Sequence, residues 1–324
     1  MSKEETATDK SYQHHSPVLL DEVLEYIDPQ DRKHYLDCTF GAGGYTKAIL
    51  KKADCFVTAL DRDPTTLVFA NEIQEEFVGR FEFVQTNFAS AKDKLEGKQF
   101  DGIVLDLGIS SMQVDSAERG FSFMRDGDLD MRMGLDGISA SEFIENASEE
   151  EIANVIYKYG EEVQSRHIAK AIVEARKESP IDTTFKLADI VRSSMHYRKG
   201  KIDPSTKTFQ AIRIHINKEL ESLERFLESL KDMLKAGGRI LVVSFHSLED
   251  SIVKSFFKEY SAKKVARSKY AKDVADYDDD KWLKIITKKP VTPSRSEVLR
   301  NPRSRSSRLR VAEKMDNKEK VNVA

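Results

Sequence analysis

The sequence predicts an α/β protein with a mostly parallel, Rossmann-like sheet that is interrupted by an inserted helical segment. Between residues 35 and 107, short buried apolar runs alternate with helical patterns. Helical patterns dominate from about 112 to 204, and the alternation then resumes. Strands that alternate with helices form right-handed crossovers and a parallel sheet. Ligands of such sheets bind at the carboxyl ends of the strands.

The composition excludes several classes of protein. The chain has 324 residues and a net charge of −3, so it can bury a sizeable core and has no overall charge signature of a nucleic-acid binder. Cys38 and Cys55 lie in expected strands without metal-ligand spacing, which favours reduced, buried thiols and no metal. No run approaches the roughly 18 apolar residues of a membrane helix, so we expect a soluble, cytoplasmic protein.

The strands are expected where apolar runs are short and end at turn residues. They lie at residues 35–38, 55–60, 81–85, 102–107, 239–245, 282–287 and 308–312. The helices are expected where apolar side chains recur every three or four residues, at 18–27, 45–52, 65–75, 90–95, 139–146, 148–160, 165–178, 184–195, 220–234 and 248–260. Gly237 and Gly238 are expected to end the long helix that begins at Leu220. Residues 1–13 are predicted to be a disordered tail, and 261–281 a charged loop.

Glycines stand between the first strand and its helix, in the stretch Gly41–Ala42–Gly43–Gly44. Glycine lets a backbone turn tightly and approach a ligand closely, and the first turn of a helix adds unpaired N–H groups. This pattern is typical of a nucleotide-type site, although a plain strand-to-helix turn has the same composition.

Two further residues follow neighbouring strands. Asp61 lies about 20 residues beyond Gly41, the separation at which an acid after the second strand binds the ribose of a nucleotide. Alternatively, Asp61 caps the next helix. Phe88 follows the third strand, where an aromatic ring either covers an adenine or packs in the core.

A carboxylate also ends the fourth strand. Asp106 precedes Gly108 and the hydroxyls of Ser110 and Ser111. A buried, unpaired carboxylate is costly, so Asp106 is expected to have either hydrogen-bond partners or a function. An acid at this position suits a site that holds a sulfonium cation and accepts protons from an N–H group.

Taken together, these motifs resemble the RsmH (MraW) family, and the resemblance covers nearly the whole chain after residue 14. The blocks that carry it lie at residues 37–45, 61–64, 105–111, 118–127, 129–133, 208–213, 244–250 and 301–306. Members are S-adenosylmethionine-dependent methyltransferases that modify the N4 amine of one cytidine in the decoding region of small-subunit (16S) ribosomal RNA. The resemblance implies a class I methyltransferase sheet of about seven strands.

The resemblance also implies how the chain is divided into domains. Residues 14–112 and 205–324 would form the methyltransferase domain, and 113–204 an inserted helical domain that recognises the substrate. The implied cofactor contacts are Gly43, Gly44, Tyr45, Asp61, Phe88, Asp106 and Gln113. The family often has histidine where this chain has Tyr45, an exchange that is harmless if the contact is made by the backbone.

Catalysis by this family requires neither a metal nor a covalent intermediate. The N4 lone pair is delocalised, so the reaction depends on orientation and on acceptors for the charge that develops on nitrogen. We therefore expect Asp106 and Ser110 near the reacting centre. His246 either orients the base or precedes a helix capped by Ser247. Phe245 either stacks on an exposed base or packs in the core.

The expected partner is small-subunit ribosomal RNA, which the family resemblance places within an assembled subunit. Aromatics and arginines alternate near Phe121, and basic residues gather at Arg198, Lys199, Lys201 and Lys207 and again between Lys288 and Arg308. These segments either contact RNA, or the aromatic and arginine stretch belongs to a helical core and the basic runs are solvated loops. Two other functions remain open: a NAD-dependent oxidoreductase, and a non-catalytic RNA-binding assembly factor. The oligomeric state is not readable from the sequence.

Overall fold

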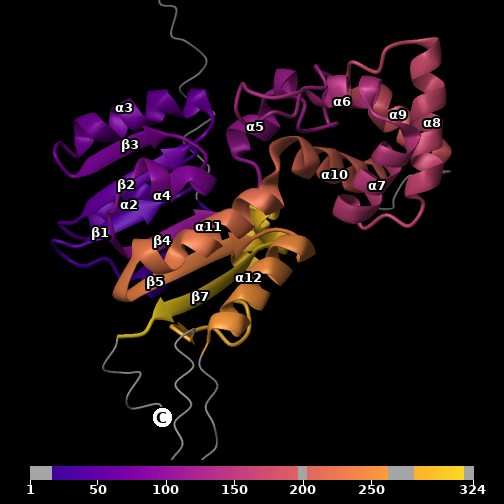
Figure 1. Cartoon of the computed structure of the whole chain (residues 1–324). Helices are drawn as coiled ribbons and strands as arrows, with labels where there is room; N and C mark the ends of the chain where they lie inside the picture. Colours follow the sequence, from indigo (N-terminus) through magenta and orange to yellow (C-terminus); the bar gives the residue numbers. More distant parts are fainter. Residues whose placement is uncertain (1–16, 196–202, 262–280, 317–324) are drawn as a thin grey trace, which may run out of the picture. The chain divides into compact units, whose positions relative to one another are not determined.

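The computed structural model describes residues 17–195, 203–261 and 281–316 (Figure 1). The predicted tail at 1–13, most of the charged loop, and Arg198, Lys199 and Lys201 lie outside the described residues. The chain forms two compact units. The sheet unit contains residues up to Asp61, Thr65–Gly108 and the chain from Leu223 onward, and the helical unit contains Arg62–Pro64 and Ile109–Ser222.

The sheet unit is built on seven strands within the described ranges. In spatial order they are β3 (Phe81–Gln85), β2 (Phe56–Asp61), β1 (His34–Asp37), β4 (Phe100–Asp106), β5 (Leu234–Ser244), β7 (Arg308–Lys314) and β6 (Leu283–Ile285). The first five are parallel to one another, and β7 runs antiparallel to both of its neighbours. The predicted fold class is confirmed: a mostly parallel, Rossmann-like sheet of seven strands.

Helices cover both faces of this sheet, because each helix has one apolar stripe to bury. On one face lie α1 (Leu20–Ile27), α2 (Gly44–Lys52) and α3 (Leu67–Glu76), and on the other lie α4 (Ala91–Lys94), α11 (Glu219–Met233) and α12 (Ser247–Tyr260). The stripe of α11 includes Phe226 and Leu230, both fully buried. Burying one such side chain contributes about 1.5–3 kcal/mol.

Short elements complete the unit after the third strand and before β7. They are η3 (Phe88–Ser90), α13 (Arg295–Arg300) and η5 (Pro302–Ser306), while η2 (Pro64–Thr66) crosses the boundary between the units.

The boundary between α11 and β5 differs from the prediction. The helix ends at Met233, and Gly237 and Gly238 lie inside β5. The register shifts there, because Phe100 pairs with Leu234 whereas Gly102 pairs with Arg239. Gly237 has a φ of 75°, which L side chains rarely adopt. The two glycines therefore form an irregularity at the start of a strand rather than the end of a helix.

The helical unit contains α5 (Ser111–Asp115), η4 (Ala117–Arg119), α6 (Ala140–Asn146), α7 (Glu149–Gly160), α8 (Ser165–Glu178), α9 (Thr184–Ser194) and α10 (Ser205–Asn217). Ser139 and Ser148 begin α6 and α7 with capping boxes. The sequence pattern did not predict α10, which packs against α7 and buries side chains on most of its sides. None of the helices in the described ranges has the length and apolar character of a membrane span.

Candidate functional site

The turn between β1 and α2 is tight, and its glycines are needed for packing. Gly43 has a φ of 78°, and a Cβ there would lie 2.3 Å from Cδ1 of Ile73. A Cβ on Gly44 would lie 2.3 Å from Cγ of Pro17. Among the described residues, no side chain caps the start of α2. The first N–H groups of this helix are therefore available to an anionic or hydroxyl-bearing ligand.

Asp61 ends β2 and is bound to this turn. Its Oδ2 accepts a hydrogen bond from the backbone N–H of Gly41 at 2.8 Å. The N-cap residue of α3 is Thr66, so Asp61 is not the cap of that helix. A carboxylate held against the glycine turn can accept hydrogen bonds from the hydroxyls of a ribose bound there.

Phe88 begins η3 and is half-buried. Its ring packs at a right angle against Phe226, with 5.9 Å between the ring centroids. The Asn87 side chain accepts the N–H of Ala89 at 2.9 Å and fixes this short helix. The ring therefore packs on the core and also keeps exposed surface that a flat base could cover.

Asp106 ends β4, next to β1. Its backbone N–H donates to the hydroxyl of Thr39 at 2.7 Å. The residue keeps some exposed surface, but its Oδ1 atom is completely buried and has no hydrogen-bond partner among the described residues. Burial raises the pKa of Asp106 well above its usual range, and the Asp37 and Glu249 carboxyls raise this pKa further, whereas the Tyr45 phenol lowers it.

Asp37 is a site residue that the sequence analysis missed as an individual candidate. It ends β1, is fully buried, and accepts hydrogen bonds from the Thr46 hydroxyl at 2.8 Å and the Thr39 N–H at 3.2 Å. Burial raises the pKa of Asp37 to about 6. The signal in the sequence was an acid that ends a strand shortly before the glycine turn, because such an acid must lie at the same sheet edge as Asp61 and Asp106.

Tyr45 points into the protein. Its phenol donates a hydrogen bond to the carbonyl of Val18, and burial raises the phenol pKa well above its usual range. The side chain is 4% exposed, so its ring belongs to the core. A contact with a ligand through the Tyr45 backbone remains compatible with this position.

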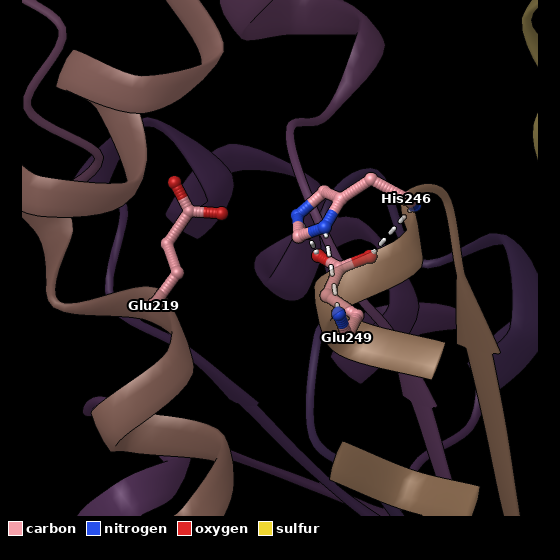
Figure 2. A group of neighbouring side chains, drawn as sticks. All are labelled: Glu219, His246 and Glu249. Carbon is pink, nitrogen blue, oxygen red and sulfur yellow. Dashed lines mark hydrogen bonds and ion pairs between the residues drawn. The ribbon is translucent and has the colours of Figure 1, made fainter. Parts of the chain in front are cut away.

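His246 and Glu249 form the capping box of α12 (Figure 2). The Glu249 N–H donates to Nδ1 of His246 at 3.4 Å, and the Glu249 carboxylate accepts the Phe245 N–H at 2.8 Å. The other ring nitrogen, Nε2, lies 3.1 Å from Oε1 of Glu249. The cap residue of α12 is therefore His246 rather than Ser247, and the role of His246 in orienting a base stays a prediction. Glu219, also drawn in Figure 2, belongs to the helical unit, where it pairs with Arg213 at 2.8 Å.

Ser110 and Gln113 lie in the helical unit and form the capping box of α5. Gln113 is 5% exposed, and its Nε2 donates to Oδ2 of Asp63 at 2.8 Å. Arg119 pairs with the same carboxylate at 2.9 Å. These contacts hold Ser110 and Gln113 in place within the unit. Their predicted contacts with a cofactor or substrate stay predictions.

The segments expected to contact RNA differ in how far their side chains are packed, paired or exposed. Phe123 packs against Phe209 with ring centroids 4.9 Å apart, and Arg192 lies over its ring, so this part of the aromatic and arginine pattern is helical core. Lys207 pairs with Glu162 at 3.2 Å. The basic residues between Lys288 and Arg308 in the sheet unit are exposed, although Arg308 also pairs with Asp250 at 3.1 Å. The members of this basic segment are Lys288, Lys289, Arg295, Arg300, Arg303, Arg305 and Arg308.

The sheet unit thus brings the glycine turn, Asp61, Phe88, Asp37 and Asp106 to one edge, where the parallel strands end. This strand order, with β7 antiparallel beside β5, defines the Rossmann-like fold of the class I methyltransferases. The model of the MraW methylase family matches residues 12–315. The chain belongs to this family, as the motifs in the sequence indicated.

Individual proteins are also similar to most of this chain. A protein of Rickettsia akari (strain Hartford), named ribosomal RNA small subunit methyltransferase H, is 62% identical over 303 residues, which are 94% of this chain and 99% of the relative. A protein of the same name from Rickettsia bellii (strain RML369-C) is 61% identical over 303 residues, again 94% of this chain and 99% of the relative. A crystal structure of an rRNA methylase from Streptococcus thermophilus aligns with a TM-score of 0.41 and 9% identity, covering 92% of this chain and 94% of that one.

Proposed function

We propose that this protein transfers a methyl group from S-adenosylmethionine to the N4 amine of a cytidine in the decoding region of 16S ribosomal RNA. Membership of the MraW methylase family and the names of the close relatives support ribosomal RNA as the substrate. One observation carries the proposal. Two acids, Asp61 and Asp106, end strands on either side of β1, and the glycine turn follows β1 itself.

The residues at this edge fit the donor. Asp61 would accept hydrogen bonds from the ribose hydroxyls. The backbone of Gly43, Gly44 and Tyr45 would approach the donor closely. Phe88 would cover the adenine. The buried Oδ1 of Asp106, which lacks a hydrogen-bond partner in the described part of the chain, suits a cationic group. When bound, S-adenosylmethionine supplies an electrophilic methyl group on a positively charged sulfur.

The protein's own contribution is to orient the amine and to stabilise the positive charge that develops on its nitrogen. The N4 lone pair must lie in line with the carbon–sulfur bond, and positioning of this kind can supply several kcal/mol of the barrier. As nitrogen becomes tetrahedral it gains positive charge, which the Asp106 carboxylate would stabilise. Ser110 and His246 are proposed to assist, Ser110 through its hydroxyl and His246 by orienting the base.

The RNA is proposed to bind partly on the exposed basic segment between Lys288 and Arg308. Seven cations in about twenty residues, all exposed, suit a phosphate backbone. Met124 and Arg125 are also exposed, and they would offer the helical unit an apolar and a cationic contact with unstacked bases. The proposed substrate is RNA within an assembled small subunit, in the cytoplasm.

Two measurements test this function. Equilibrium binding of S-adenosylmethionine and of NAD distinguishes the methyltransferase from an oxidoreductase on a related sheet, and we expect binding of the former alone. Transfer of a labelled methyl group to assembled small subunits distinguishes the enzyme from a non-catalytic assembly factor. Tight binding of NAD, or donor binding without any transfer to RNA or subunits, would contradict the proposal.

A further inference from the structure

Two carboxyl groups at the centre of the sheet edge are near enough for their charges to interact: Asp37 is fully buried, and the Oδ1 atom of Asp106 is buried as well. Asp37 ends β1 and Asp106 ends β4, and these strands are paired in the sheet. Asp37 accepts hydrogen bonds from the hydroxyl of Thr46 and the N–H of Thr39, and the Thr46 backbone also lowers its pKa; all of these groups are neutral. The buried Oδ1 of Asp106 has no hydrogen-bond partner in the described part of the chain. The Tyr45 phenol lowers the pKa of Asp106 but is itself neutral, so the pair has no positively charged partner among the described residues, unlike most buried charges.

The groups that face this pair do not supply a positive charge. From β1 comes Asp37 with Cys38 beside it, from α2 the Tyr45 phenol, and from α12 the Glu249 carboxylate. Tyr45 is also influenced by Glu297, another acid. None of the groups that shift the pKa of Asp37 or Asp106 in the described residues is a lysine or an arginine. Two negative charges in this setting require a proton or a cation.

We propose that the Asp37–Asp106 pair holds one proton in the free protein and releases it when the positive sulfur of S-adenosylmethionine binds. This inference rests on the function proposed above and adds to it a role for Asp37. Asp37 is a positioning residue, because it acts through the charge on Asp106. Coupled carboxyl groups titrate as a pair, so the proton belongs to both residues rather than to either one.

The same exchange accounts for the proton that the reaction sets free. During transfer the carbon–sulfur bond breaks and its electrons stay on sulfur, while the N4 lone pair forms the new carbon–nitrogen bond. The methylated nitrogen then loses a proton. Once sulfur is neutral, the pair can take up one proton again, so it can receive the N4 proton without another base. The product, S-adenosylhomocysteine, leaves a site that no longer attracts it by charge.

Calorimetry of the wild-type protein tests this directly. S-adenosylmethionine and S-adenosylhomocysteine differ in the methyl group and the charge on sulfur. Their heats of binding in buffers of different ionisation enthalpy give the number of protons released. At about pH 7 we expect the first ligand to release up to about one more proton than the second, and its affinity to rise with pH where the pair titrates. Equal proton release by the two ligands at every pH would overturn the inference.

The variant Asp37→Asn tests the role of the second carboxyl. We expect the preference for S-adenosylmethionine over S-adenosylhomocysteine to fall about tenfold, with a smaller difference in proton release. The matched control is Asp101→Asn, because Asp101 is on the same strand as Asp106 but already pairs with Lys33 and Lys235. This control should keep the wild-type preference. An unchanged preference in Asp37→Asn would overturn the role of Asp37.

Binding measurements distinguish a missing donor site from a donor site that binds without proton exchange. If neither ligand binds, the donor site itself is absent and the proposed function fails. If both bind with equal proton release, the donor site exists and only the exchange is wrong. If Asp37→Asn does not fold, the measurement on the wild-type protein still decides.

Discussion

The backbone N–H of Gly41 donates to the carboxylate of Asp61 at 2.8 Å, and this bond joins the turn after β1 to the end of β2. The contact positions an acid beside the part of the backbone that a ligand can approach most closely. The arrangement suits recognition of two neighbouring hydroxyls and underlies the first prediction.

Asp61→Ala should weaken binding of S-adenosylmethionine by about tenfold to a hundredfold. Hydrogen bonds to a charged group contribute about 1.5–3 kcal/mol, and the ribose would lose its acceptor. Titration calorimetry measures the change, and Asp101→Asn again serves as the control. Wild-type affinity in Asp61→Ala would remove this residue from the donor site.

Asp106→Asn should lower kcat by about a hundredfold or more at saturating donor. Asparagine keeps the size of the side chain but cannot carry the charge that opposes the developing positive charge on nitrogen. Single-turnover methyl transfer at several donor concentrations separates this effect from weaker binding. Near-normal turnover in the variant would show that Asp106 does not act on the reacting centre.

The pH dependence of stability should change when Asp37 is replaced by asparagine. The folded-state pKa of Asp37 is raised from 3.8 to about 6, so its contribution to stability is fully present below pH 3.8 and is lost as the pH rises through about 6. The loss amounts to about 3 kcal/mol. The Asp37→Asn variant has no carboxyl group at this position and so does not lose this stability. Its free energy of unfolding relative to wild type should therefore rise between about pH 4 and pH 7. Urea unfolding at several pH values measures this difference, and parallel curves would contradict it.

Neutralising part of the basic segment should reduce the salt dependence of binding to small-subunit RNA. In the triple variant Lys288→Ala, Lys289→Ala and Arg300→Ala, the slope of log K against log salt should fall by about 2, because each lost phosphate contact removes roughly 0.7. The control replaces three exposed lysines at the ends of α2 and α4, namely Lys51, Lys52 and Lys94. Equal slopes in both variants would contradict an interface on this segment.

Most of the sheet was predictable because buried parallel strands are nearly continuous apolar runs between turns. The helix α10 was not, because it is buried on most sides and its polar face is too narrow to show a helical period. The end of α11 was misplaced because glycine pairs more often end helices than enter strands. The irregular start of β5, which Gly237 permits, depends on its pairing with β4.

The candidate site was predictable where a residue type and a spacing together indicate a ligand, as for Asp61 and Asp106. Asp37 was not singled out, because its position at a strand end carries no spacing to a ligand, and its importance comes from its burial and its effect on Asp106. Nor could the sequence decide between the two interpretations of His246. The capping box with Glu249 depends on the ring orientation, which only the structure provides.

The most direct test of the central claim is mass mapping of methylated nucleosides in 16S RNA after incubation of unmethylated small subunits with the purified protein and S-adenosylmethionine. The account predicts one new N4-methylated cytidine in the decoding region, which the Asp106→Asn variant forms at least about a hundredfold more slowly. No new methyl group, or a methyl group on another atom or another region of the RNA, would contradict it.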